Sequence, residues 1–222
     1  MIATNTCPTD DFKNIFLYIW SIQAFHNLGI LEYVSKFYYQ SYELDSIEFY
    51  EMFLDFCEHS ETLFNQEYLK VKDYIDTGCS GGGWDHYDEK LSNTFCSIEE
   101  ASWLRCCLQS TLLASEIRKF VIVLEYNKGF ETDYRMIYDL VEFQVFLLMT
   151  RDRNKQIKKC SFDYMWKDFF ISDKDILKKE FTTYKYQNKT QAIGLNDWCF
   201  QSIWTGRAQG NYKFHPDFLD VI

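Results

Sequence analysis

Proline occurs at only two of the 222 positions, Pro8 and Pro216, near opposite ends of the chain. A proline inside a helix removes a backbone hydrogen bond and clashes with the preceding turn. The stretch between these two positions can therefore form long helices without interruption. Apolar side chains recur there at steps of three and four residues, which is the period of an amphipathic helix. The sequence therefore predicts a mainly α-helical fold.

Capping signals divide this stretch into separate helices. Asp45 with Glu48, and Ser97 with Glu100, have the spacing of a capping box, in which the first side chain caps a helix and the second reaches back. Gly206 indicates the C-terminal end of a helix, where glycine is common. We expect helices over residues 9–27, 30–39, 45–57, 61–75, 97–124 (with a break near Ala114), 132–150 and 196–205.

The first of these helices carries apolar residues on several faces. Its three-four stripe consists of Phe12, Ile15, Ile19, Ile22 and His26, and further large side chains fall between these positions. A helix that is apolar on most sides is usually buried on most sides. We therefore expect this helix to be buried on most sides and Gly29 to end it.

The period changes after a basic run, Arg151 to Lys159, which we interpret as a solvated connection rather than a phosphate site. Apolar and polar residues alternate over 160–164, and residues 181–187 are rich in Thr and Tyr, as in strands. Two short strands are expected to pair across a helical turn at 166–179. The predicted fold is one domain, 1–222. It has an irregular bundle of about seven or eight helices in a core at 1–153, followed by a hairpin-like β element and a short helix at 154–222.

Composition excludes several classes of protein. Hydrophobic residues make up 47% of the chain and aromatic residues 19%, which argues against disorder. The net charge of −10 repels phosphate backbones and anionic bilayers, so we expect no nucleic-acid or membrane partner. No apolar run is long enough to cross a bilayer, and the start lacks the pattern of a secretory signal. The eight cysteines are scattered, as for reduced thiols in a cytoplasmic protein.

The strongest chemical candidate is the glycine-rich loop near residue 83. Gly81-Gly82-Gly83 precedes Trp84, Asp85, His86 and Asp88, and glycines allow a backbone to approach a ligand closely. An imidazole beside carboxylates can bind a divalent ion or transfer protons. Loops are also polar by default, so two interpretations remain open: a ligand site, or an ordered structural or docking loop.

Two residues outside the loop are further candidates. His26 lies on the first helix, either as a hydrogen-bonded core residue or facing a neighbouring domain. Arg207 follows Trp204 and Gly206 and can pair with a carboxylate or a phosphate. No C-x-x-C pair, phosphate-binding loop or nucleophile elbow is present, so the sequence predicts neither a metal site nor a complete catalytic site.

Several separated patches resemble one family, the C-terminal region of cobalamin-binding-type radical SAM proteins. Their order and approximate spacing cover nearly the whole chain. The patches are Asn5-Thr6, Asp11-Phe12, the helix through Trp20, Phe25-His26-x-x-Gly29, Phe49-Tyr50 through Phe56, Glu67-Tyr68, Gly82-Gly83-Trp84, Ser97-x-Glu99-Glu100-Ala101, Asp139-Leu140 to Phe143-Gln144, Phe162-Asp163-Tyr164 and Trp204-x-Gly206-Arg207.

The resemblance implies an accessory role. Enzymes of this family bind a [4Fe–4S] cluster through a C-x-x-x-C-x-x-C motif, S-adenosylmethionine in the barrel, and cobalamin in a separate N-terminal domain. This sequence contains neither the C-x-x-x-C-x-x-C motif nor the cobalamin domain. No catalytic residue can therefore be assigned from the family, and no cofactor is expected in this chain. The implied partner is a radical SAM barrel on the same or another chain. Two alternatives stay open: an independent acidic interaction or inhibitor module, and an enzyme built on Asp85–Glu89 with His26 or Arg207.

Overall fold

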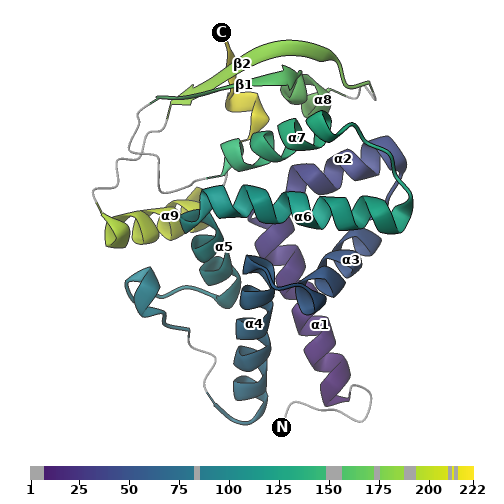
Figure 1. Cartoon of the computed structure of the whole chain (residues 1–222). Coiled ribbons are helices and arrows are strands. Elements are labelled where there is room, and N and C mark those ends of the chain that lie inside the picture. Colours follow the sequence, from purple (N-terminus) through teal and green to yellow (C-terminus); the bar gives the residue numbers. More distant parts are fainter. Residues whose placement is uncertain are drawn as a thin grey trace.

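The computed structural model describes residues 8–82, 86–148, 157–172, 176–187, 194–209, 212 and 215–222. Within these residues it contains nine α-helices and a three-stranded antiparallel sheet, so the predicted mainly α fold with a small β element is confirmed (Figure 1). The predicted boundary at 153–154 and most of the basic run lie outside the described residues.

The elements follow one another along the chain in this order. They are α1 (Thr9–Ser21), the π-helix η1 (Ile22–Asn27), α2 (Glu32–Tyr42), α3 (Ser46–His59), α4 (Leu63–Cys79), the 3₁₀ turn η2 (Glu89–Leu91), α5 (Ile98–Leu108), α6 (Ser110–Lys128), α7 (Tyr134–Leu147), β1 (Ile157–Tyr164), α8 (Trp166–Ile171), β2 (Lys179–Gln187), α9 (Leu195–Gln209), the 3₁₀ turn η3 (Pro216–Phe218) and β3 (Asp220–Val221).

Both predicted capping residues are confirmed, but the complete capping box is found only at the second helix. Asp45 accepts a hydrogen bond from the backbone of Ile47, and Glu48 pairs with Lys128 of α6. Ser97 and Glu100 form the complete capping box at the start of α5. The expected break lies at Gln109 rather than near Ala114, because Gln109 leaves the helical conformation and starts α6.

The prediction that the first helix is buried on most sides is wrong in part. Leu17 and Trp20 of α1 and Phe25 of η1 are buried, whereas Ile15 is 52% exposed and Ile19 is 47% exposed. Helices α3, α4 and α5 contact α1, and they cover the Leu17–Trp20 side of it. The aromatic residues therefore occupy the core face, and the isoleucines on the other face are left without cover.

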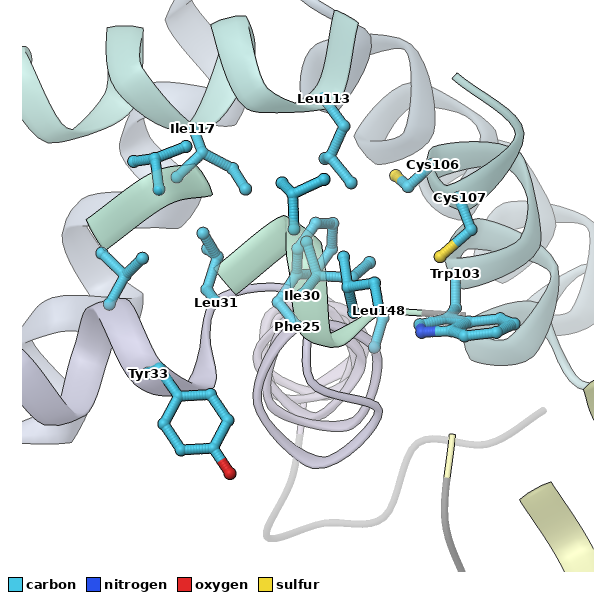
Figure 2. Packing of buried hydrophobic residues seen from close by; sticks show 14 of the residues in the cluster. Phe25, Ile30, Leu31, Tyr33, Trp103, Cys106, Cys107, Leu113, Ile117 and Leu148 are labelled. Carbon is cyan, nitrogen blue, oxygen red and sulfur yellow. The ribbon is translucent and has the colours of Figure 1, made fainter. Parts of the chain in front are cut away.

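The core is built largely from aromatic rings that meet at steep angles. Phe25 contacts Phe53 and Phe64 with ring centroids 4.5 and 5.4 Å apart, and Phe120 of α6 contacts Phe53 at 5.2 Å. Figure 2 shows Phe25 within a buried cluster that includes Ile30 and Leu148 and, from α6, Leu113 and Ile117. Such contacts each add to the free energy gained by burial, so these rings hold the helices together.

Buried polar side chains connect elements that are distant in sequence. Gln144 of α7 donates to the carbonyl of Gly29 (2.6 Å) and accepts from the backbone of Tyr33 (2.7 Å). Glu116 of α6 accepts from the backbone of Leu63 at the start of α4 (2.9 Å). Each side chain satisfies a backbone group that would otherwise be buried without a partner, and so fixes where two elements meet.

The sheet has one strand more than predicted. β1 and β2 pair antiparallel over the expected residues, and β3 joins β2 through Val221 and Asp220. Phe162 and Tyr184 of the sheet contact Phe143 of α7 at 5.5 and 6.0 Å between ring centroids. The sheet therefore packs on α7, as Figure 1 shows.

The predicted stop at Gly206 is also wrong, because α9 continues to Gln209. A β-carbon at position 206 would lie 2.2 Å from the nearest ring atom of Tyr212. The glycine is thus explained by the close approach of this ring and not by a left-handed turn.

Candidate functional site

The loop that follows α4 is the region where we expected chemistry. Trp84 and Asp85 lie outside the described residues, but His86 and Asp88 are described. Asp88 precedes η2 and accepts a hydrogen bond from the backbone of Lys90 at 2.9 Å. The aspartate is therefore already part of a local turn that shapes the loop.

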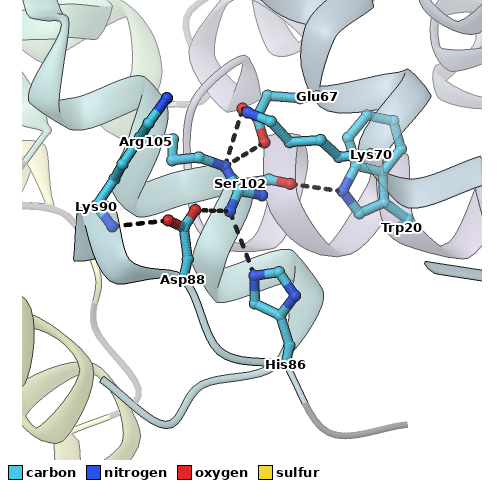
Figure 3. Close-up of polar contacts among 8 residues, drawn as sticks. All are labelled: Trp20, Glu67, Lys70, His86, Asp88, Lys90, Ser102 and Arg105. Atoms are coloured by element: carbon cyan, nitrogen blue, oxygen red, sulfur yellow. Dashed lines mark hydrogen bonds and ion pairs between the residues drawn. The ribbon is translucent and has the colours of Figure 1, made fainter. Parts of the chain in front are cut away.

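An arginine of α5 connects this loop to α4. The Nε atom of Arg105 donates to both carboxylate oxygens of Glu67, at 2.9 and 2.7 Å. Its Nη1 atom donates to Oδ2 of Asp88 at 2.8 Å, and Lys70 reaches Glu67 from the solvent side at 2.7 Å (Figure 3). Glu67 is fully buried and Arg105 is 6% exposed. The pairs thus lie mostly out of water, where losing one partner is costly.

The same arginine determines the state of His86. A guanidinium can only donate hydrogen bonds, so the contact of 3.3 Å between Nη1 of Arg105 and Nε2 of His86 requires an unprotonated Nε2. The proton of the neutral ring is then on Nδ1. Burial and the neighbouring Arg105 lower the pKa of His86, in agreement with a neutral ring. His86 therefore has its basic nitrogen occupied, which does not suit a general base.

The charges of this cluster balance. Two carboxylates, Glu67 and Asp88, face the two cations Arg105 and Lys70. Nη2 of Arg105 is the one atom of the guanidinium that is buried without an acceptor among the described residues.

Beside the guanidinium, Trp20 of α1 donates to Ser102 of α5 at 3.1 Å. We refer to Glu67, His86, Asp88 and Arg105 below as the Arg105 cluster.

Arg207 belongs to a second ion pair. It donates from Nε and Nη2 to the carboxylate of Glu100, at 2.9 and 2.6 Å, and Tyr212 donates to the same carboxylate. Burial alone would raise the pKa of Glu100, but these donors hold it below its ordinary value. The predicted carboxylate partner of Arg207 is thus within the chain, and the pair ties α9 to the start of α5.

His26 lies in the π-helix that continues α1. Its Nδ1 atom is 3.2 Å from the hydroxyl of Tyr50 in α3, and the two rings meet edge to face. The candidate residues that the structure describes therefore fall into three groups: His86 and Asp88 on Arg105, Arg207 on Glu100, and His26 on Tyr50.

Sequence reasoning missed Glu67 and Arg105 as parts of the site. A signal for Arg105 is present, since it is the one basic residue of α5 and its neighbours are Trp103, Leu104, Cys106 and Cys107. An arginine surrounded by core residues needs a carboxylate partner nearby. Nothing in the sequence indicates which of the many carboxylates provides it.

Within the described residues, no three His, Cys, Asp or Glu side chains are placed so that they could hold a metal ion. None of the helices described has both the length and the apolar composition that a membrane span requires. No protein-family model matches the chain, and no curated protein matches it either. The radical SAM resemblance therefore rests on the sequence patches alone.

Proposed function

We propose that this chain is a non-catalytic accessory domain, of the kind that the resemblance assigns to the C-terminal region of cobalamin-binding-type radical SAM proteins. Such a domain supports a catalytic barrel, shapes access of substrate or provides protein contacts. The cofactors of the enzyme, a [4Fe–4S] cluster, S-adenosylmethionine and cobalamin, would be bound by other parts of the assembly.

One observation supports this proposal: among the described residues, the candidate polar side chains His86, Asp88 and Arg207 contact charged partners within the chain. His86 and Asp88 contact Arg105, while Arg207 contacts Glu100. A catalytic group needs a free lone pair or proton directed at a substrate. Side chains that neutralise each other instead hold a loop and a helix in place.

Two measurements test the accessory role. A barrel with the C-x-x-x-C-x-x-C motif is expected in the same reading frame or in a partner gene, and this chain should copurify with it in a complex that contains iron. The chain alone, incubated without oxygen with iron and sulfide, should acquire no iron–sulfur chromophore. A stable cluster on the isolated chain, or a known barrel that leaves the chain unbound, would contradict the proposal.

A second candidate is an independent acidic interaction module, and the distribution of charge favours it. Residues 1–82 contain thirteen carboxylates and four lysines, a net charge of −9, whereas residues 83–222 contain twenty carboxylates and nineteen basic residues. Almost the whole net charge therefore belongs to the part of the chain that forms α1 to α4. This candidate function requires a basic protein partner. Unlike the accessory role, it does not require a radical SAM barrel.

A further inference from the structure

The face of α1 that the core leaves uncovered is apolar. Ile15 and Ile19 are one helical turn apart and about half exposed, and the partly buried Tyr18 and Ile22 fall on the same side of the helix. Single exposed apolar residues are ordinary on protein surfaces. A row of them along one helix face is a feature that partner helices recognise.

Helix α3 contacts α1 next to this face. Tyr18 of α1 lies near Glu51 and Asp45: partial burial raises the pKa of its hydroxyl, and these two carboxylates raise it further. At the other end, Asn14 of α1 and Glu58 of α3 line one cavity. Figure 1 shows the two helices crossing, so α3 borders the apolar row where it passes α1.

The exposed side of α3 that includes Glu51 carries a second carboxylate, Asp55, which also pairs with His59, and one exposed isoleucine. Glu51 and Asp55 are exposed at a spacing of four residues, and Ile47, one turn before Glu51, is 60% exposed. Lys13 is the only basic residue of α1, and it pairs with Asp76 of α4 on the opposite side. The result is an apolar row with carboxylates along one border; we refer to it as the α1–α3 face.

The carboxylates beside this face limit which partners can bind to it. A second copy of the chain would bring its own carboxylates against these, and an anionic bilayer would also be repelled. A helix with an apolar row and flanking lysines or arginines satisfies both features, since its apolar residues cover Ile15 and Ile19 while its cations meet Glu51 and Asp55. We infer that the α1–α3 face binds a basic amphipathic helix of a protein partner.

This inference rests on the second candidate function, the acidic interaction module, because it names the class of partner that such a module contacts. The probe is a fluorescein-labelled peptide of leucine and lysine, about 14 residues long so that it can run beside α1, with leucines at helical spacing. A scrambled peptide of identical composition has the same charge but no apolar face. Anisotropy titrations of the full chain compare the two.

The helical peptide should bind the chain about tenfold or more tightly than the scrambled peptide. The double substitution Ile15→Ser/Ile19→Ser should weaken binding of the helical peptide by about tenfold, since it removes apolar contact area. The double substitution Glu51→Gln/Asp55→Asn should weaken binding and reduce its dependence on salt. All four positions are exposed, so the variants should fold, which circular dichroism verifies.

A matched control uses a different exposed apolar pair. Phe200 and Trp204 of α9 are 60% and 65% exposed and stack on each other, so Phe200→Ser/Trp204→Ser removes a comparable patch. It should leave peptide binding unchanged. Equal binding of both peptides, or loss of binding only in the α9 variant, would overturn the inference. Neither result affects the proposed function, which is tested by cofactor uptake and by copurification with a barrel.

Discussion

Single residues of the Arg105 cluster have states that can be measured. His86 is held neutral by burial and by Arg105, so its pKa in the folded protein is lower than in the unfolded chain. As pH falls below the ordinary histidine value of about 6.5, the unfolded chain therefore binds more protons than the folded protein. The folded protein is destabilised by acidification until pH falls below the folded pKa of His86.

We predict that His86→Asn removes this part of the pH dependence. Urea unfolding at about pH 7.5 and about pH 5.5, on either side of the ordinary pKa, should show a larger loss of stability in the wild type than in the variant. Protonation of His59 stabilises the folded protein instead, because contacts with Asp55 raise the pKa of His59. His59→Asn is therefore the control, and it should enlarge the loss on acidification. An identical pH dependence in the wild type and in His86→Asn would show that His86 is not held neutral.

At the scale of elements, α9 is attached to the helical bundle by two kinds of contact. Trp198 stacks on Trp103 of α5, with ring planes 11° apart, and the Glu100 carboxylate receives Arg207 and Tyr212. The aromatic contact buries area, and the ion pair sets the position of the last turn of α9. Because Glu100 is 6% exposed, a missing donor leaves a nearly buried carboxylate less well paired.

We predict that Arg207→Gln loosens α9 without unfolding the bundle. The expected loss of stability is about 1 kcal/mol, the usual contribution of such a hydrogen bond. Hydrogen exchange of the α9 amides should become faster by up to about tenfold, while α1 to α4 keep their protection. The exposed Lys72, which pairs with Glu58, provides the control Lys72→Gln with no change in α9. Unchanged exchange in the Arg207 variant would mean that the aromatic stack alone holds the helix.

The elements themselves could largely be predicted from sequence, because caps and periods are local signals. Asp45 and Ser97 start helices where their side chains indicate, and β1 and β2 alternate as expected. The predictions were wrong where tertiary contacts determine the end of a helix or the face that it buries. Gly206 is explained by the ring of Tyr212, and the core face of α1 is chosen by its neighbours rather than by the regular isoleucine row.

For the candidate site, sequence identified loop residues but not their partners. His86 and Asp88 were expected to act together, and they do meet, but on Arg105, which is nineteen and seventeen positions further along the chain. Glu67 reaches the same arginine from α4. Which carboxylate meets which cation depends on how the helices pack, and no local pattern encodes that. The same limit explains why Glu100 was recognised as part of a capping box but not as the partner of Arg207.

At the scale of the whole molecule, two kinds of charge have different roles. Three of the buried charged side chains, Glu67, Arg105 and Glu100, form ion pairs that connect elements. Most of the net charge lies instead in the part of the sequence that forms α1 to α4, where exposed carboxylates such as Glu51 and Asp55 border an apolar row. This separation is the physical basis for proposing a domain that makes contacts rather than one that carries out a reaction.

The most direct test of the central claim, that the Arg105 cluster is structural, is a double-mutant cycle on Glu67 and Arg105. Arg105→Met alone should cost about 3–5 kcal/mol in urea unfolding, because it leaves a buried carboxylate without its main partner. The double variant Glu67→Met/Arg105→Met should be more stable than Arg105→Met, since no buried charge of the pair remains unpaired. Lys72→Met at an exposed pair should cost less than about 1 kcal/mol. If Arg105→Met were neutral or stabilising, as substitutions at functional sites often are, the structural account of the cluster would be contradicted.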